Sequence, residues 1–194
     1  MKVVAVNGSP RKKGNTSILL GVVLAELEAQ GIATEVIQIG GQAIAGCKAC
    51  YACAKHQDQT CAIKTDAFNA WYAKVLEADG LILASPTYYT DITSEMKAFI
   101  DRAGFVSRNN GILLAGKVGA SLVAMGRAGG VHALDTMNHL FLGARMIIPG
   151  SSYWNIGIGR DMGEVEKDAM GLETMRVLGQ DMARLMKALA AYQG

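Results

Sequence analysis

A chain of 194 residues is long enough for one domain with a proper buried core. Its 51% hydrophobic and 19% charged residues predict a globular fold and exclude a disordered chain. The formal net charge of +2, with no long basic run, argues against a nucleic-acid partner. No run of about 18 apolar residues occurs, and the N-terminus has no cleavage-site pattern, so we expect no membrane span and a cytoplasmic location.

Strand-like and helix-like patterns alternate along the chain, which we expect to form a single domain over residues 1–194. Short apolar runs that end in turn residues predict strands, and longer runs opened by capping residues predict helices. This βα pattern, repeated five times, predicts an α/β fold in which a parallel sheet is covered by helices on both faces. In chain order, the expected strands are 2–7, 33–39, 81–86, 117–125 and 145–150, and the expected helices are 16–31, 65–80, 94–104, 131–144 and 164–192.

The loop after the first expected strand, "NGSPRKKGNTS" at residues 7–17, is rich in hydroxyl side chains and glycine. Hydroxyls and free N–H groups at the start of a helix form an anion site. The loop lacks both the Gly-Lys-Ser/Thr of nucleoside-triphosphate loops and the Gly-x-Gly-x-x-Gly dinucleotide fingerprint. A monophosphate therefore fits it better, and a plain, well-capped helix start is the alternative. The expected phosphate-facing residues are Ser9, Arg11, Asn15, Thr16 and Ser17.

Two further loops follow the third and fourth expected strands, and both should reach the same edge of the sheet. In "SPTYYTD", residues 85–91, Tyr88 and Tyr89 offer rings that could stack on a flat ligand. In "GRAGG", residues 126–130, the glycines let the backbone approach a ligand closely. The alternatives are a tyrosine pair at the edge of the core and an ordinary turn.

The stretches "NGSPRKKGNTS", "ADGLILASPTYYTDITSEMKAFIDR" and "GRAGG" resemble, in this order, the flavodoxin-like FMN reductase family, and the resemblance covers nearly the whole chain. It implies a flavodoxin-like doubly wound sheet of five strands in the order 2-1-3-4-5, with FMN as the cofactor. Within "KAFIDR" we expect Asp101 and Arg102 to be structural or to lie at a subunit contact. Besides the phosphate-facing residues, the family pattern implies that the ring and ribityl chain are flanked by Pro86, Thr87, Tyr88, Tyr89, Asp91, Gly126, Arg127 and Gly130.

All four cysteines lie in "CKACYACAKHQDQTC", residues 47–61, which we call the cysteine segment. Its overlapping C-x2-C steps resemble those of the iron–sulfur flavoproteins of anaerobes. That resemblance implies a [4Fe–4S] cluster between the second strand and the second helix, near the FMN of a neighbouring subunit. Such a cluster takes four thiolates. Zinc also binds thiolates, inert thiols are a third interpretation, and disulfides are rare in the cytosol. The implied ligands are Cys47, Cys50, Cys53 and Cys61.

The expected function is that of an FMN-dependent oxidoreductase, in which the flavin carries the chemistry. No catalytic acid or base is assigned. With a cluster, a ferredoxin-like donor would pass single electrons through it to FMN. Without a cluster, NAD(P)H would reduce the flavin for a quinone, free flavin or another acceptor. A non-enzymatic, flavin-binding redox sensor is the alternative of another class, and the resemblance also implies a homo-oligomer, either a dimer or a tetramer.

Overall fold

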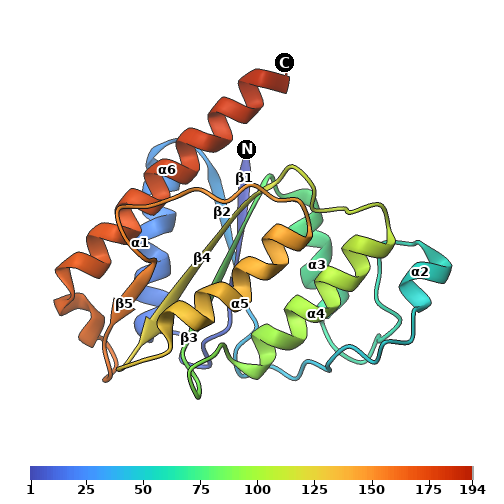
Figure 1. Cartoon of the computed structure of the whole chain (residues 1–194), viewed down its shortest axis with the longest axis horizontal. Coiled ribbons are helices and arrows are strands. Elements are labelled where there is room, and N and C mark those ends of the chain that lie inside the picture. Colours follow the sequence, from blue (N-terminus) through green and yellow to red (C-terminus); the bar gives the residue numbers. More distant parts are fainter. Residues whose placement is uncertain (194) are drawn as a thin grey trace.

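Helices and strands alternate through the computed structural model, which describes residues 1–193 (Figure 1). The termini lie at one end of the molecule and the loops that follow the strands lie at the other (Figure 1). The elements are β1 (Lys2–Asn7), α1 (Asn15–Ala29), β2 (Ala33–Gln38), α2 (Ala52–His56), α3 (Phe68–Glu77), β3 (Gly80–Pro86), α4 (Ser94–Asn109), β4 (Val118–Met125), α5 (Gly130–Gly143), β5 (Ile156–Ile158), the 3-10 turn η1 (Glu164–Lys167) and α6 (Ala169–Gln193).

The five strands form one parallel sheet in the order β2-β1-β3-β4-β5, which confirms the expected topology. In the centre of the sheet, Val6 of β1 is in register with Ile37 of β2 and with Leu83 of β3. The chain leaves β1 toward one side of the sheet and leaves β3 toward the other. The loops after β1 and β3 therefore start side by side at the point where strand order reverses, which is where doubly wound folds bind ligands.

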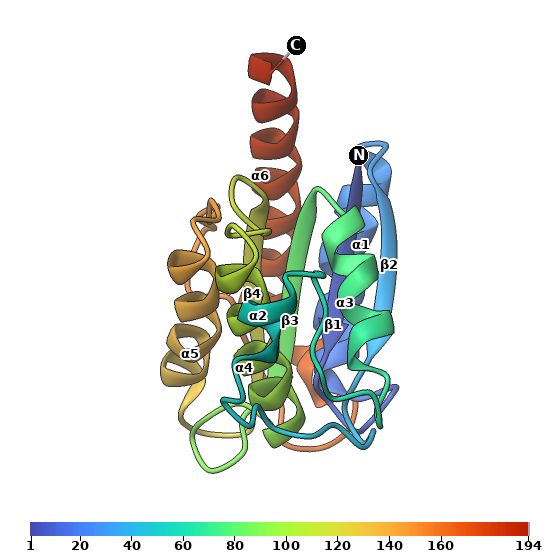
Figure 2. The same cartoon turned by 90° about the vertical axis from the view of Figure 1, so that its right-hand side faces the viewer.

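Helices cover both faces of the sheet, and Figure 2 looks onto one face, with β4, β3, β1 and β2 side by side. Helices α1 and α6 pack on one face, and α3, α4 and α5 pack on the other (Figures 1 and 2). Within β1, Val3 and Ala5 belong to the core under α1 and α6, whereas Val4 and Val6 belong to the core under the other helices. Because both faces are buried, the strand reads as one continuous apolar run, and that is why it could be predicted.

The fifth strand is not where the sequence pattern placed it. Of the expected strand 145–150, only Ile147 pairs with the sheet, through a single bridge to Val118 at the start of β4. The ladder stops there because Pro149 has no N–H to donate. The chain re-enters the sheet at Ile156–Ile158, beside the last residues of β4. The prediction of strand 145–150 was therefore wrong, although the number and order of strands were right.

The segment between β2 and α3 differs from its prediction as well. It contains the short helix α2, which no pattern indicated, and the left-handed residues Tyr51 and Gln57 flank that helix. Helix α3 starts at Phe68, three residues later than expected, and α4 extends to Asn109. Across residues 1–193, no helix has the length and the apolar composition needed to cross a bilayer.

Candidate functional site

Three loops meet at the carboxyl edge of the sheet and enclose a cavity of about 160 Å³. The first follows β1, the second follows β3 and the third follows β4, as the doubly wound topology requires. The segment after β5 closes the cavity and was not singled out from the sequence. The residues that line it are Ser9, Arg11, Gly14, Asn15, Thr16, Pro86, Thr87, Tyr88, Ala124, Gly126, Gly159 and Arg160.

The loop after β1 is held in shape by side chains at the ends of two strands. The Asn7 side chain bonds both ends of the loop: Oδ1 accepts from the N–H of Ser9 at 2.9 Å, and Nδ2 donates to Oγ of Ser17 at 3.0 Å. From β2, Nε2 of Gln38 donates to the carbonyl of Ser9 at 2.5 Å. Ser9 is buried, and its hydroxyl accepts from the N–H of Arg11 at 3.3 Å. The loop is therefore preorganised around Ser9.

Helix α1 starts without a side-chain cap. Its N-cap residue is Gly14, and no side chain accepts a hydrogen bond from the first turn at this position. The turn is tight, since a Cβ on Gly14 would lie 2.9 Å from Cβ of Arg11. Thr16, in the first turn, is buried and lines the cavity. An uncapped helix start beside hydroxyl groups fits an anionic group such as a phosphate, and does not fit the alternative of a well-capped helix.

Asn15 lines this cavity and Ser17 is not among its lining residues, and both side chains are engaged in other hydrogen bonds. Nδ2 of Asn15 donates to the carbonyls of Gly159 and Asp161 at 2.8 and 2.9 Å, and its Oδ1 accepts from the N–H of Gly163 at 2.8 Å. These bonds tie the segment after β5 to the start of α1. Ser17 accepts the Asn7 amide described above. The two side chains thus position the loops, and their predicted contact with a phosphate stays a prediction.

The second loop folds into a tight turn that carries the tyrosine pair. Tyr88 and Asp91 exchange two backbone hydrogen bonds of 2.7 and 3.1 Å, and Tyr89 and Thr90 between them have φ of 48° and 67°. Left-handed backbone at two successive non-glycine residues is rare and costly, and such strain clusters at functional sites. Tyr88 is half-exposed and Tyr89 fully exposed. The rings are therefore available for a flat ligand or for a neighbouring molecule.

The third loop packs directly against this turn. Gly129 has φ of 86°, and a Cβ there would lie 2.4 Å from Cα of Thr90, so only glycine allows the contact. Gly126 and Arg127 are exposed, and Gly130 is the buried first residue of α5. The glycines of this loop were expected to let a ligand approach the backbone closely. At Gly129 the group that approaches closely is another loop of the same chain.

Asp91 links the second loop to α5. Its Oδ2 lies 3.5 Å from Nε2 of His132. Burial raises the pKa of the Asp91 carboxyl, but the hydrogen bond from the N–H of Ile92 and the nearby polar side chains of Thr136 and His132 outweigh it, and the pKa is lowered below its ordinary value. The carboxylate is thus held in its charged form beside α5, outside the set of residues that line the cavity.

The cysteine segment forms a second candidate site, on the face covered by α4. Its four cysteines are free thiols, and all four line one narrow cavity of about 20 Å³ beside Arg102 and Phe105. The backbone is left-handed at Ala49 and Tyr51, which separate successive cysteines. Four thiols around one cavity are the number and type of ligands that a zinc ion or a [4Fe–4S] cluster takes. Within residues 1–193, however, no three His, Cys, Asp or Glu side chains are grouped closely enough to hold a metal ion.

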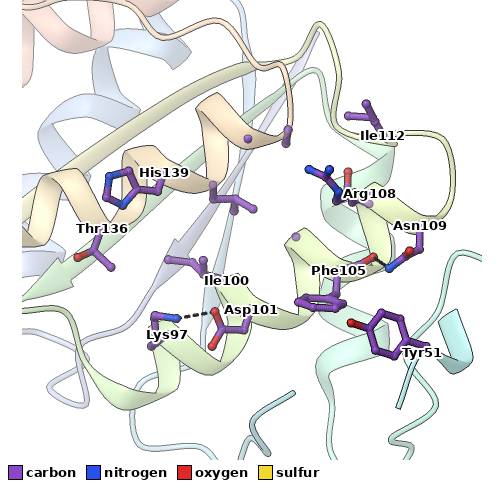
Figure 3. A pocket seen from close by; sticks show the side chains of 15 residues that line it. Tyr51, Lys97, Ile100, Asp101, Phe105, Arg108, Asn109, Ile112, Thr136 and His139 are labelled. Carbon is purple, nitrogen blue, oxygen red and sulfur yellow. Dashed lines mark hydrogen bonds and ion pairs between the residues drawn. The ribbon is translucent and has the colours of Figure 1, made fainter. Parts of the chain in front are cut away.

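A larger groove of about 490 Å³ runs between α4 and α5 beside the cysteine segment (Figure 3). Tyr51 and Phe105 line both this groove and the cysteine cavity, and their rings pack edge-on with centroids 6.0 Å apart. The groove has apolar walls, including Ile100, and an ion pair of 2.5 Å between Lys97 and Asp101 at its rim (Figure 3). Sequence reasoning missed it because helix packing alone creates it.

The chain is similar to known proteins over most of its length. A family model described as NADPH-dependent FMN reductase matches residues 1–161. An iron–sulfur flavoprotein of Methanocaldococcus jannaschii is 33% identical, with 97% of this chain and 99% of the relative covered. An iron–sulfur flavoprotein of Methanosarcina thermophila is 29% identical, with 97% of each chain covered.

The solved structures support the fold. The structure of RosB with its bound intermediate, 8-demethyl-8-formylriboflavin-5′-phosphate, has a TM-score of 0.79 at 20% identity, and the match covers 98% of this chain and 81% of RosB. A flavodoxin from the domain Archaea has a TM-score of 0.63 at 18% identity, over 96% of this chain and 99% of that one. At such low identity, these similarities establish the flavodoxin-like fold alone.

Proposed function

Because this chain belongs to the NADPH-dependent FMN reductase family, we propose that it is an oxidoreductase that binds FMN at the carboxyl edge of its sheet. The observation that carries this proposal is the uncapped start of α1 at Gly14, which opens beside Ser9 and Thr16 onto a cavity that Tyr88 also lines. FMN, when bound, supplies the hydride and single-electron chemistry. The chain's own part is to bind and orient the flavin, and no acid or base is assigned.

The phosphate of FMN would be held by the loop after β1. The hydroxyls of Ser9 and Thr16 and the N–H groups of the first turn of α1 are the donors, and Arg11 supplies a positive charge at the rim. The turn carrying Tyr88 and Tyr89 would flank the ring. Asp91, through His132, keeps that turn against α5.

We further propose that the cysteine segment holds a [4Fe–4S] cluster and takes electrons from a ferredoxin-like donor. Two observations support this. The two relatives described above are named iron–sulfur flavoproteins, and all four thiols of this chain line one cavity. Because the cysteine side chains are not gathered in a metal-binding arrangement, cluster binding would draw the segment together, as metal binding commonly orders such loops.

A second candidate function is a cluster-free, NAD(P)H-dependent reductase of FMN or a quinone. The family model that matches the chain favours it, since it is described as NADPH-dependent. A flavin-binding redox sensor is a third candidate, and turnover separates it from both enzymes. A sensor would bind FMN but would neither consume NAD(P)H nor accept electrons from ferredoxin.

The deciding experiment measures FMN, iron and acid-labile sulfide in protein that is purified and reconstituted without oxygen. We expect one FMN and about four iron and four sulfide per chain. Cys50→Ala should abolish the iron while FMN stays bound, because the two sites lie on different segments. Lys48→Ala, an exposed substitution in the same segment, is the matched control. Iron at background level in the wild type would contradict the cluster and leave the cluster-free reductase.

A further inference from the structure

We propose that Arg102 of α4, together with Asp66, positions the cysteine segment for its metal group and acts on that group as a nearby positive charge. This inference rests on the proposed function, because it assumes that the four thiols hold such a group. The two residues form a clasp, by which we mean the hydrogen bonds that join Arg102, Asp66, Ala45 and Ile63.

The clasp closes the cysteine segment at its base. Nη1 of Arg102 donates to Oδ2 of Asp66 at 2.6 Å and to the carbonyl of Ala45 at 3.2 Å, and Nη2 donates to the carbonyl of Ile63 at 3.2 Å. The N–H of Ala45 in turn donates to Oδ2 of Asp66 at 2.9 Å. Ala45 lies two residues before Cys47, and Ile63 lies two residues after Cys61. One guanidinium thus holds the chain on both sides of the four thiols.

Helix α4 holds the segment at a second place, about two turns further along. Nδ2 of Asn110 donates to the carbonyl of Cys53 at 3.3 Å, and its Oδ1 accepts from the N–H of Gln59 at 3.0 Å. Nδ2 of Asn109 lies 3.7 Å from Sγ of Cys53, within hydrogen-bond range for sulfur. The segment is therefore fastened at two places, to Arg102 within α4 and to Asn110, the C-cap residue of that helix.

Arg102 has one donor without a partner among the described residues. The residue is 1% exposed, and its guanidinium lies 4.1 Å above the ring of Phe68. Its Nε is buried and has no hydrogen-bond partner among the described residues. Arg102 also lines the same cavity as the four cysteines. A buried donor without a partner is costly, and a group carried by four thiolates would supply both a partner and the opposite charge.

Two consequences follow for a group bound by the thiols. First, a segment already closed at its base loses less conformational entropy when the thiols converge, so binding is stronger than it would be on an open loop. Second, a positive charge beside the group favours its reduced, more negative form and raises its reduction potential, since net charge and hydrogen bonds to sulfur set that potential.

The test compares Arg102→Gln and Arg102→Lys with Lys97→Met, a control that breaks the exposed ion pair one turn away on the same helix. In metal-free protein, we expect amide exchange in residues 45–63 to become at least ten-fold faster in both Arg102 variants. After reconstitution, Arg102→Gln should bind less than half the wild-type iron, and its remaining centre should have a more negative midpoint potential. Arg102→Lys keeps the charge, so its potential should stay near the wild-type value while the faster exchange remains.

Wild-type exchange, iron content and potential in both Arg102 variants would overturn the proposal. FMN binding serves as the check that each variant is folded, because none of the clasp residues lines the proposed FMN cavity. If Arg102→Gln loses FMN, then Asp66→Asn replaces it as the test variant. It weakens the clasp and removes the carboxylate that balances the guanidinium, so it should show the same fast exchange with a more positive midpoint potential. Absence of iron from the wild type would overturn the cluster and this inference with it. Normal iron in the wild type with unchanged Arg102 variants would overturn this inference alone.

Discussion

At the scale of single residues, two hydroxyl groups should determine how tightly FMN is retained. Ser9 and Thr16 are both buried and line the cavity at the start of α1. Each charge-assisted hydrogen bond to a phosphate is worth about 1.5–3 kcal/mol. Because two such bonds are lost, we expect Ser9→Ala/Thr16→Ala to raise the Kd for FMN by about 100-fold or more, measured by quenching of flavin fluorescence. Thr34→Ala, at the opposite edge of the sheet, should not change it, and an unchanged Kd in the double variant would refute the phosphate site.

At the scale of elements, Thr93 joins the start of α4 to the loop after β1 and to the end of β3, both at the proposed FMN site. Its hydroxyl accepts from the N–H of Met96 at 3.4 Å as the helix cap and donates to the carbonyl of Gly8 at 3.0 Å, and its own N–H donates to Oγ of Ser85 at 3.1 Å. The side chain is completely buried. The hydroxyl of Thr93 thus joins the start of α4 to the loop after β1, and its backbone N–H joins them to the end of β3.

We expect Thr93→Val to lower the free energy of unfolding by about 1–2 kcal/mol, because the isosteric change removes a cap and leaves the carbonyl of Gly8 without its donor. Urea unfolding followed by circular dichroism measures this loss, and a weaker affinity for FMN should accompany it. Ser94→Ala changes the adjacent, exposed hydroxyl and serves as the control. Equal free energies of unfolding for the two variants would show that the hydrogen bond to Gly8 does not contribute to stability.

At the scale of the whole molecule, we predict that the chain is a dimer or a tetramer that buries the groove between α4 and α5. Large apolar side chains are exposed on the elements that border the groove, among them Tyr51, Phe105 and Leu142. Sedimentation at micromolar concentration should give a multiple of the chain mass. Leu142→Glu should shift it to monomer, because the interface would then bury an unpaired charge. Met170→Glu, on α6 over the other face of the sheet, is the matched control, since Met170 is 68% exposed and Leu142 is 66% exposed.

If the wild type sediments as a monomer, the homo-oligomer is wrong, and electron transfer between subunits loses its structural basis. A Leu142→Glu variant that stays oligomeric would instead place the interface elsewhere on the surface.

The sequence by itself determined the architecture, because the signals for it are local. Strands buried on both faces appear as unbroken apolar runs, and their alternation with helices requires a parallel sheet. The loops after β1, β3 and β4 could be assigned to one site from topology alone, since parallel strands end at the same edge. Ser9, Thr16 and Tyr88 were identified in this way, and all three line the cavity.

The tertiary structure alone decided the features that depend on distant partners. The position of β5 is one example. Residues 145–150 have the better local pattern, but the sheet is completed by Ile156–Ile158, whose pairing partners lie in β4 and whose Ile158 N–H donates to Asp168. The closure of the cavity by Gly159 and Arg160 depends on that placement. Arg102 is the clearest case: as an arginine it is expected at the surface, yet it is buried because its partners, 36 to 57 positions away in the sequence, meet it only in the folded chain.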